Sequence, residues 1–317
     1  MEWLESAAEG IALLRPQTAA KLRCPDTLRL TYQPDGEGLC ANVATDFLDR
    51  ILPLLDEEPR IGVFQVPELY LKKGDMAEAL ARAFTWLNAK VVVRAAKPAL
   101  AEYHTWYFLT SIVSDDRWED VFAVTINAQS GAAVRLPDPL TALDLEPNPA
   151  PEPETALTYR NAIRQANEQM QQRSAAFVSR LEARLQRDRR RLRDYYNALL
   201  REATSRISKS KTEQDRDKQD ARRRAVELEL RRKLSDLNDR YAIRAELVPL
   251  VLVRVGVQVL AVHCEVFRKQ AHKTHIIYWN PLLKELEPMC CSACGASGFA
   301  LAFTDSDVRP LCAGCAG

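Results

Sequence analysis

The stretch from residue 154 to residue 248 contains neither glycine nor proline, although both occur on either side of it. Glycine and proline are the residues that most often interrupt helices. Their absence over 95 residues predicts a long helical segment. As one straight helix this segment would span roughly 140 Å, so the way it folds back or pairs decides the architecture of the chain.

Apolar residues recur in this segment at steps of mostly three, four or seven, which is typical of a coiled-coil seam. The first run is Ile163, Met170, Phe177, Leu181, Leu185, Leu192, Tyr195, Leu199 and Ile207, and the second is Val226, Leu230, Leu234, Leu237 and Tyr241. The insert between the two runs has no large apolar side chain. We therefore favour an antiparallel coiled-coil hairpin that turns within residues 209–217. The alternative is one continuous helix that forms a homodimer, because a tight turn usually contains a glycine and this insert has none.

Opposite charges separate along the chain, although its formal net charge is only +1. Residues 1–154 hold 14 basic and 24 acidic side chains, whereas residues 155–248 hold 24 basic and 14 acidic ones. An acidic head therefore precedes a basic arm. The basic side chains gather in short clusters, of which the candidates for contacting nucleic acid or an acidic partner are Arg187, Arg189, Arg190, Arg191, Arg193, Arg222, Arg223 and Arg224.

Three interpretations of these arginines stay open. Adjacent residues on a helix point about 100° apart, so neighbouring arginines cannot share one face and some must meet solvent. They either form a phosphate-binding surface or line the solvated flank of a coiled coil, paired with nearby aspartates. An acidic partner, or the acidic head itself, is a third candidate to cover them.

The head, residues 1–136, mixes predicted helices and strands. We expect helices over residues 1–14 and 44–55, and a third that begins after an Asp75 cap, with Glu78 completing a capping box. This third helix is expected to bury Met76, Leu80, Phe84 and Leu87. Alternating segments predict strands over residues 28–32, 60–66, 90–94, 106–113 and 121–127, and a turn over 127–131 that leads into 132–136. Adjacent strands with separate helices indicate an α+β fold with an antiparallel sheet.

The head carries no phosphate-binding, nucleophile-elbow or metalloprotease motif. His104 lies between aromatic residues and is interpreted as a packing residue. Asp115, Asp116, Glu119 and Asp120 are interpreted as a solvated loop. We therefore expect no enzymatic activity, and an enzyme in the head is the weakest of three functional hypotheses.

A proline-rich linker, residues 137–153, joins the head to the arm, residues 154–248. Segments rich in proline are extended and semi-rigid. After the arm, Pro249 and an alternating valine-rich run predict a small β module over residues 249–289. His263, Cys264, His272 and His275 lie close in this sequence, and a second metal site there is a minor alternative.

Two cysteine pairs end the chain: Cys291 with Cys294, and Cys312 with Cys315. Two CxxC pairs 17 residues apart have the spacing of a structural metal site with four thiolate ligands, which leaves no position open for catalysis. Cys290 is an alternative ligand to Cys291. Residues 290–317 resemble the zinc-ribbon class, and the resemblance implies Zn²⁺ as the cofactor. It covers only this segment, and we identify no family for the whole chain.

Free CxxC pairs favour a reducing compartment, and neither a signal peptide nor a transmembrane segment is evident. We therefore expect a cytoplasmic protein that is not associated with a membrane. The favoured function is a non-catalytic zinc-binding adaptor that docks a nucleic-acid-processing enzyme such as a helicase or polymerase, with nucleic acid contacted through the arm. The alternative is a structural coiled-coil scaffold or oligomerisation protein with no role in nucleic-acid chemistry.

Overall fold

In the computed structural model, the described residues are 61–71, 74–140, 142–148 and 155–316, together with four strands between residues 2 and 40. The chain divides into two compact units, Met1–Arg60 and Ile61–Gly317. The helix expected over residues 44–55 lies outside the described residues.

The first unit contains a four-stranded sheet in the order β1 (Glu2–Ser6), β2 (Glu9–Leu13), β3 (Thr27–Thr31) and β4 (Leu39–Cys40). The strand expected over residues 28–32 is confirmed as β3. The helix expected over residues 1–14 is wrong, because two antiparallel strands occupy this segment, with Glu5 opposite Gly10. A glycine costs a helix interior about 1 kcal/mol relative to alanine, while pairing with both β1 and β3 satisfies the backbone of β2.

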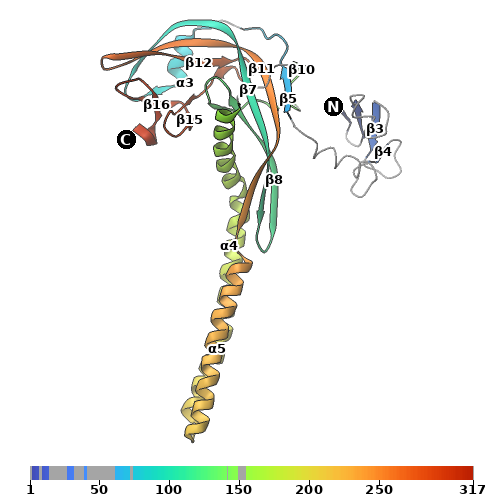
Figure 1. The fold of residues 1–317 in the computed structure, drawn as a ribbon, viewed down its shortest axis with the longest axis vertical. Coiled ribbons are helices and arrows are strands. Elements are labelled where there is room, and N and C mark those ends of the chain that lie inside the picture. Colours follow the sequence, from blue (N-terminus) through green and yellow to red (C-terminus); the bar gives the residue numbers. More distant parts are fainter. Residues whose placement is uncertain are drawn as a thin grey trace. The chain divides into compact units, whose positions relative to one another are not determined.

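A mixed sheet of eight strands lies at one end of the second unit, and a long helical arm extends away from it (Figure 1). The main order is β10 (Glu146–Pro147), β5 (Ile61–Gln65), β11 (Arg244–Arg268), β7 (Lys90–Val113), β8 (Arg117–Asn127) and β9 (Ala133–Val134). β11 pairs with β7 along most of its length, so β5 and β12 (Ala271–Asn280) share its other edge. The short β13 (Glu285–Leu286) pairs with β12.

From Leu252 to Val266, β11 is a valine-rich run that is covered on both of its faces, whereas its first residues are mostly exposed and pair with β7. Pro249 has no N–H to donate, and the register shifts between Pro249 and Val251. The structure corrects two expectations here. Residues 244–268 lie in the same sheet as the head strands, between β5 and β7, rather than in a separate module. The strands expected over 90–94 and 106–113 are parts of the single strand β7.

A short helix, α3 (Met76–Ala83), covers one part of the sheet. The Asp75 carboxylate accepts hydrogen bonds from the backbone N–H groups of Ala77 and Glu78, which confirms the predicted cap. The Glu78 carboxylate pairs with Arg82. Leu87 was expected to be buried on this helix, but the helix ends at Ala83 and Leu87 is 50% exposed.

The arm consists of two helices, α4 (Ala156–Lys209) and α5 (Glu213–Arg240). The helical segment breaks at residues 210–212, inside the range predicted for a turn, and the Thr212 hydroxyl caps α5. Arg189 donates to Asn238 and the Tyr241 hydroxyl donates to Asp188, so α5 runs back beside α4. The helical segment stops at Arg240, earlier than predicted, because residues from Arg244 onward pair with β7.

The sheet end of α4 packs on β7 and β8. Ala162 and Ala166 contact the cluster of Phe108, Phe122, Val124 and Ile126, and Phe177 and Leu181 contact Ile112 near the β7–β8 turn. Beyond Leu185 the buried partners of α4 come from α5. One seam residue was misplaced: Tyr195 is 61% exposed, and its neighbour Tyr196 is buried in its place.

The chain ends in two small sheets and a short helix. β14 (Met289–Cys290) pairs with β15 (Ser297–Gly298), while β16 (Ala300–Phe303) pairs with β17 (Pro310–Cys312) and, in parallel, with β6 (Thr85–Trp86). The helix α6 (Ala313–Ala316) follows β17. Leu301, Phe303 and Val308 are buried against α3 residues Met76 and Leu80. No helix in the described part of the chain is long and apolar enough to cross a membrane.

Candidate metal centre and arm surface

The sulfur atoms of Cys291, Cys294, Cys312 and Cys315 all lie within 4.8 Å of one another. The Cys294 and Cys312 Sγ atoms are 3.6 Å apart. Four thiolates about 2.3 Å from one tetrahedral ion would be about 3.8 Å from each other. The spacing of these sulfurs therefore matches a site that could hold a metal ion.

Two tight turns position these cysteines. The first knuckle, residues 291–295, connects β14 to β15. The Gly295 N–H donates to the Cys291 carbonyl at 2.7 Å, and the Cys291 N–H donates to the Ala296 carbonyl at 2.8 Å. Gly295 has a φ of 71°, a left-handed conformation that glycine adopts without strain. The second knuckle, residues 312–315, runs from the last residue of β17 into α6.

The pKa values of Cys291 and Cys315 shift in opposite directions. Burial raises the pKa of Cys291, but backbone N–H groups of Cys294, Cys312 and Ala293 point at its sulfur and lower the pKa to about 6. Hydrogen bonds with the thiols of Cys312 and Cys294 raise the pKa of Cys315 to about 12. Four thiolates this close together would repel one another. A bound cation would balance their negative charge, and its binding would release the protons of thiols that were still protonated.

Other cysteines lie outside this cluster. The Cys290 thiol points at the Gly295 carbonyl, 3.3 Å from its oxygen, so Cys291 rather than Cys290 joins the group of four. Among the described residues, the ligand atoms that lie close enough together to hold an ion belong to the four cysteines. The residues considered for a second metal site do not form such a group there. Alternation along β11 and β12 explains this: Cys264 is opposite His275, whereas His263 is opposite Ile276 and His272 is opposite Phe267.

His104 is buried, with 1% of its surface exposed, and it contacts Glu102 and Thr158. This order of hydroxyl, imidazole and carboxylate resembles a catalytic triad, but Thr158 is also buried and Arg254 holds the carboxylate of Glu102. Burial lowers the pKa of His104, against the effect of Glu102. The group connects the first turn of α4 to β7, which agrees with a packing role.

The arginine clusters of the arm are largely at its surface. Arg187, Arg190, Arg191, Arg193, Arg222 and Arg224 are exposed, and Arg189 and Arg223 are half-buried. Arg223 and Arg224 pair with Asp220, and Arg191 lies 3.9 Å from Asp188. Within residues 155–316, Arg187, Arg190, Arg193 and Arg222 form no ion pair.

The two clusters do not form one patch. The Arg189–Asn238 contact sets residues 234–240 of α5 beside the α4 cluster, because the two helices run in opposite directions. Counting along the helices from this contact, Arg222, Arg223 and Arg224 lie roughly 20 Å farther toward the turn.

The acidic loop after β7 is not simply solvated. Asp115 has a side chain only 6% exposed and pairs with Arg184 and Arg240, while Asp120 pairs with Arg173. Acidic residues of the head therefore pair with arginines on both helices of the arm. A single sequence carries no local signal for them, because the pairing residues are more than 50 positions apart.

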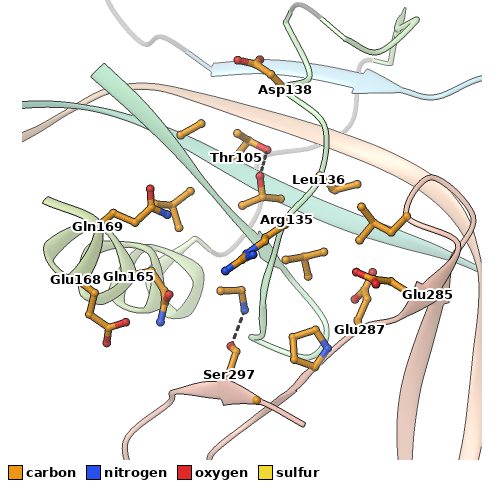
Figure 2. Close-up of a pocket in the computed structure, with 18 of the residues that line it drawn as sticks. Thr105, Arg135, Leu136, Asp138, Gln165, Glu168, Gln169, Glu285, Glu287 and Ser297 are labelled. Carbon is orange, nitrogen blue, oxygen red and sulfur yellow. Dashed lines mark hydrogen bonds between the residues drawn. The ribbon is translucent and has the colours of Figure 1, made fainter. Parts of the chain in front are cut away.

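A groove of about 880 Å³ opens between β8, β9, α4 and the segment before the first knuckle. In Figure 2, Arg135 lies between Gln165 of α4 and the carboxylates of Glu285 and Glu287. Glu287 is buried and accepts hydrogen bonds from Tyr103, Asn280 and Asn127. Burial raises the pKa of Glu287, and the three donors oppose that effect. No sequence motif marks this carboxylate or the groove.

No protein-family model, curated protein or solved structure matches this chain.

Proposed function

We propose that this protein is a non-catalytic, zinc-binding adaptor whose basic arm docks a nucleic-acid-processing enzyme, such as a helicase or polymerase, and contacts nucleic acid. The observation that supports the metal is the cluster of four sulfurs within 4.8 Å. Zinc is the ion that four-thiolate tetrahedral sites most often hold in proteins. Such a closed site stabilises structure, and it would act best in the reducing environment of the cytoplasm.

The arm is proposed to be an antiparallel coiled-coil hairpin. Half-burial of Leu192, Leu230, Leu234 and Leu237 supports a shared seam. With the seam inside, Arg187, Arg190 and Arg193 stay exposed and free of ion pairs within residues 155–316. Free guanidinium groups on a rigid rod bind phosphates by releasing counterions, which makes the affinity depend steeply on salt.

The nucleic-acid part is tested with the whole chain, because β11 pairs with β7 and a fragment from residue 155 would lose its sheet. Binding of fluorescent duplex and single-stranded DNA and RNA is measured by anisotropy between about 50 and 200 mM salt. Replacing Arg187, Arg190 and Arg193 by glutamine should lower the slope of log K against log salt by up to about 3.

The matched control replaces Lys90, Lys97 and Lys273, which are exposed on the sheet, by glutamine. It removes the same charge and should change the slope by less than the arm variant does. Absence of binding to any of these nucleic acids at 50 mM salt would contradict the nucleic-acid part.

A second candidate is a structural scaffold that acts through protein contacts alone. It is favoured by two large apolar side chains on the arm, Tyr195 and Leu228, which are 61% and 69% exposed. Sedimentation of the whole chain distinguishes the candidates: a scaffold arm would self-associate without nucleic acid, and Tyr195→Ser with Leu228→Ser would abolish that association.

A further inference from the structure

The two knuckles of the metal centre are attached to different parts of the second unit. The first knuckle is hydrogen-bonded to the sheet end of α4, and Ser297, just after the knuckle, is hydrogen-bonded to β9. The second is bonded through β16 and β17 to β6 and α3. An ion held by all four cysteines would therefore join these two parts.

Arg164 makes the main contact between α4 and the first knuckle. Its guanidinium donates to the backbone carbonyls of Cys294 and Gly295, and a side chain at Gly295 would collide with it. Both acceptors belong to the turn that orients the first two sulfurs. Arg164 thus touches the knuckle through its backbone and leaves the thiols free for an ion.

Neighbouring contacts strengthen this attachment. Asn161 is buried and donates to the Gly131 carbonyl at 2.8 Å, in the turn between β8 and β9. In the same region, the Ala133 N–H donates to the Ser297 hydroxyl at 2.7 Å. The first turns of α4, the β8–β9 turn and the segment after the first knuckle are therefore held together by hydrogen bonds.

The second knuckle is anchored elsewhere. The N–H groups of Thr85 and Leu87 donate to the carbonyls of Phe299 and Leu301, at 2.9 and 2.8 Å. Phe303 and Leu301 are buried with α3 residues. One backbone hydrogen bond, from Ser292 to Pro310 at 2.8 Å, also crosses between the two halves.

We propose that the metal centre is a joint that fixes the base of the arm, and that Arg164 is the positioning residue that couples them. The base of the arm is defined as residues 158–168 of α4. This inference rests on the metal part of the proposed function. Ion binding orders the first knuckle, the ordered knuckle presents two carbonyls to Arg164, and Arg164 then restrains the base of the arm. Coupling of this kind is reciprocal, so losing Arg164 also weakens metal retention.

The test compares hydrogen exchange in the whole chain, with zinc and after its removal by a chelator, in the natural protein and in Arg164→Met. Methionine keeps an unbranched stem but has no donor. In the natural protein, zinc removal should accelerate exchange over residues 158–168 about tenfold or more. In Arg164→Met, exchange there should be fast already, and zinc removal should add less than about twofold.

Arg160→Met is the matched control, because Arg160 is exposed one turn earlier on the same helix. It should behave as the natural protein does. Unchanged exchange over residues 158–168 on zinc removal would overturn the coupling, as would an equal response in Arg164→Met. Protein that never binds zinc would contradict the proposed function instead.

A second measurement covers the case in which zinc removal unfolds the whole unit, which faster exchange in β7 and β8 would reveal. The rate of zinc transfer to a coloured chelator is then measured on folded, zinc-loaded protein. Residues that orient metal ligands typically change metal affinity about 10- to 100-fold when replaced. Arg164→Met should release zinc about tenfold faster than Arg160→Met, and equal rates would overturn the role of Arg164.

Discussion

The Asp115 carboxylate accepts a hydrogen bond from Arg240, although the two residues are 125 positions apart in sequence. Asp115 is at the turn between β7 and β8, and Arg240 is the last residue of α5. Arg184 of α4 lies 3.4 Å from the same carboxylate. One acidic side chain from the sheet therefore holds both helices at the place where the arm leaves the sheet.

Asp115→Asn should loosen this junction. An asparagine keeps the shape of the carboxylate but removes the charge that both arginines face. We expect a melting temperature a few degrees lower and faster hydrogen exchange over the last turn of α5. Asp116→Asn is the control, because Asp116 is exposed and its contact with the Arg117 N–H survives the change. Equal effects of the two variants would show that Asp115 has no special role.

Cys312→Ser should abolish zinc binding. Binding of a structural zinc ion supplies on the order of 10 kcal/mol of folding free energy, so residues 290–316 should lose their protection from exchange while α4 beyond Phe177 keeps it. Elemental analysis should give one zinc per natural chain and none per variant. Freshly purified natural protein without metal would refute this expectation.

Leu192 and Leu234 should be neighbours within one chain. The contacts of Arg189 with Asn238 and of Asp188 with Tyr241 set the register that brings them together. Spin labels at these two positions, on protein diluted with unlabelled chain, should report a short distance. Leu192 with Leu228, which is exposed, is the comparison pair. Proximity found only between chains would favour the continuous helix that dimerises.

Glu287→Gln should destabilise the second unit. Asn127 and Asn280 use their side-chain oxygens to accept backbone N–H groups, so their amide N–H groups must face Glu287. A glutamine would bring a donor against a donor, at a cost of about 1–3 kcal/mol in the free energy of unfolding. Glu285→Gln, on the exposed neighbour in the same groove, should cost little. Chemical denaturation of both variants measures the difference.

Stability should fall as the pH drops below about 6.5. Burial lowers the pKa of His104 and of His275 below the ordinary value of 6.5. The unfolded chain therefore takes up protons at a pH where the folded chain does not, and the stability is lost as pH falls toward the folded pKa. His104→Gln should reduce the change in melting temperature between pH 7.5 and 5.5. A variant whose melting temperature changes with pH as much as that of the natural protein would contradict this role of His104.

Local features of this chain could be predicted from sequence, and distant pairings could not. The four clustered cysteines, the Asp75 cap and the turn between α4 and α5 each depend on residues close in sequence. The place of β11 between β5 and β7 depends on partners more than 100 positions away. One predicted seam residue is displaced by one position: a step of three from Leu192 gives Tyr195, a step of four gives Tyr196, and the structure buries the second.

Arg164 and Glu287 were missed for a different reason. An arginine in an arginine-rich helix, or a glutamate near a proline, has no local pattern that marks it. Their roles come from the backbone carbonyls and side-chain amides that the fold brings to them.

The arm follows β10 in the chain and continues into β11, so strands of one sheet come directly before and after it. Beyond Leu185 its buried contacts are between its own two helices. The length of the arm can therefore change without a change in the sheet. Removing equal numbers of turns from α4 and α5 would bring the tip closer to the sheet and leave every strand register unchanged. The distance from the sheet to the tip of the arm is thus set by the number of matched turns in α4 and α5.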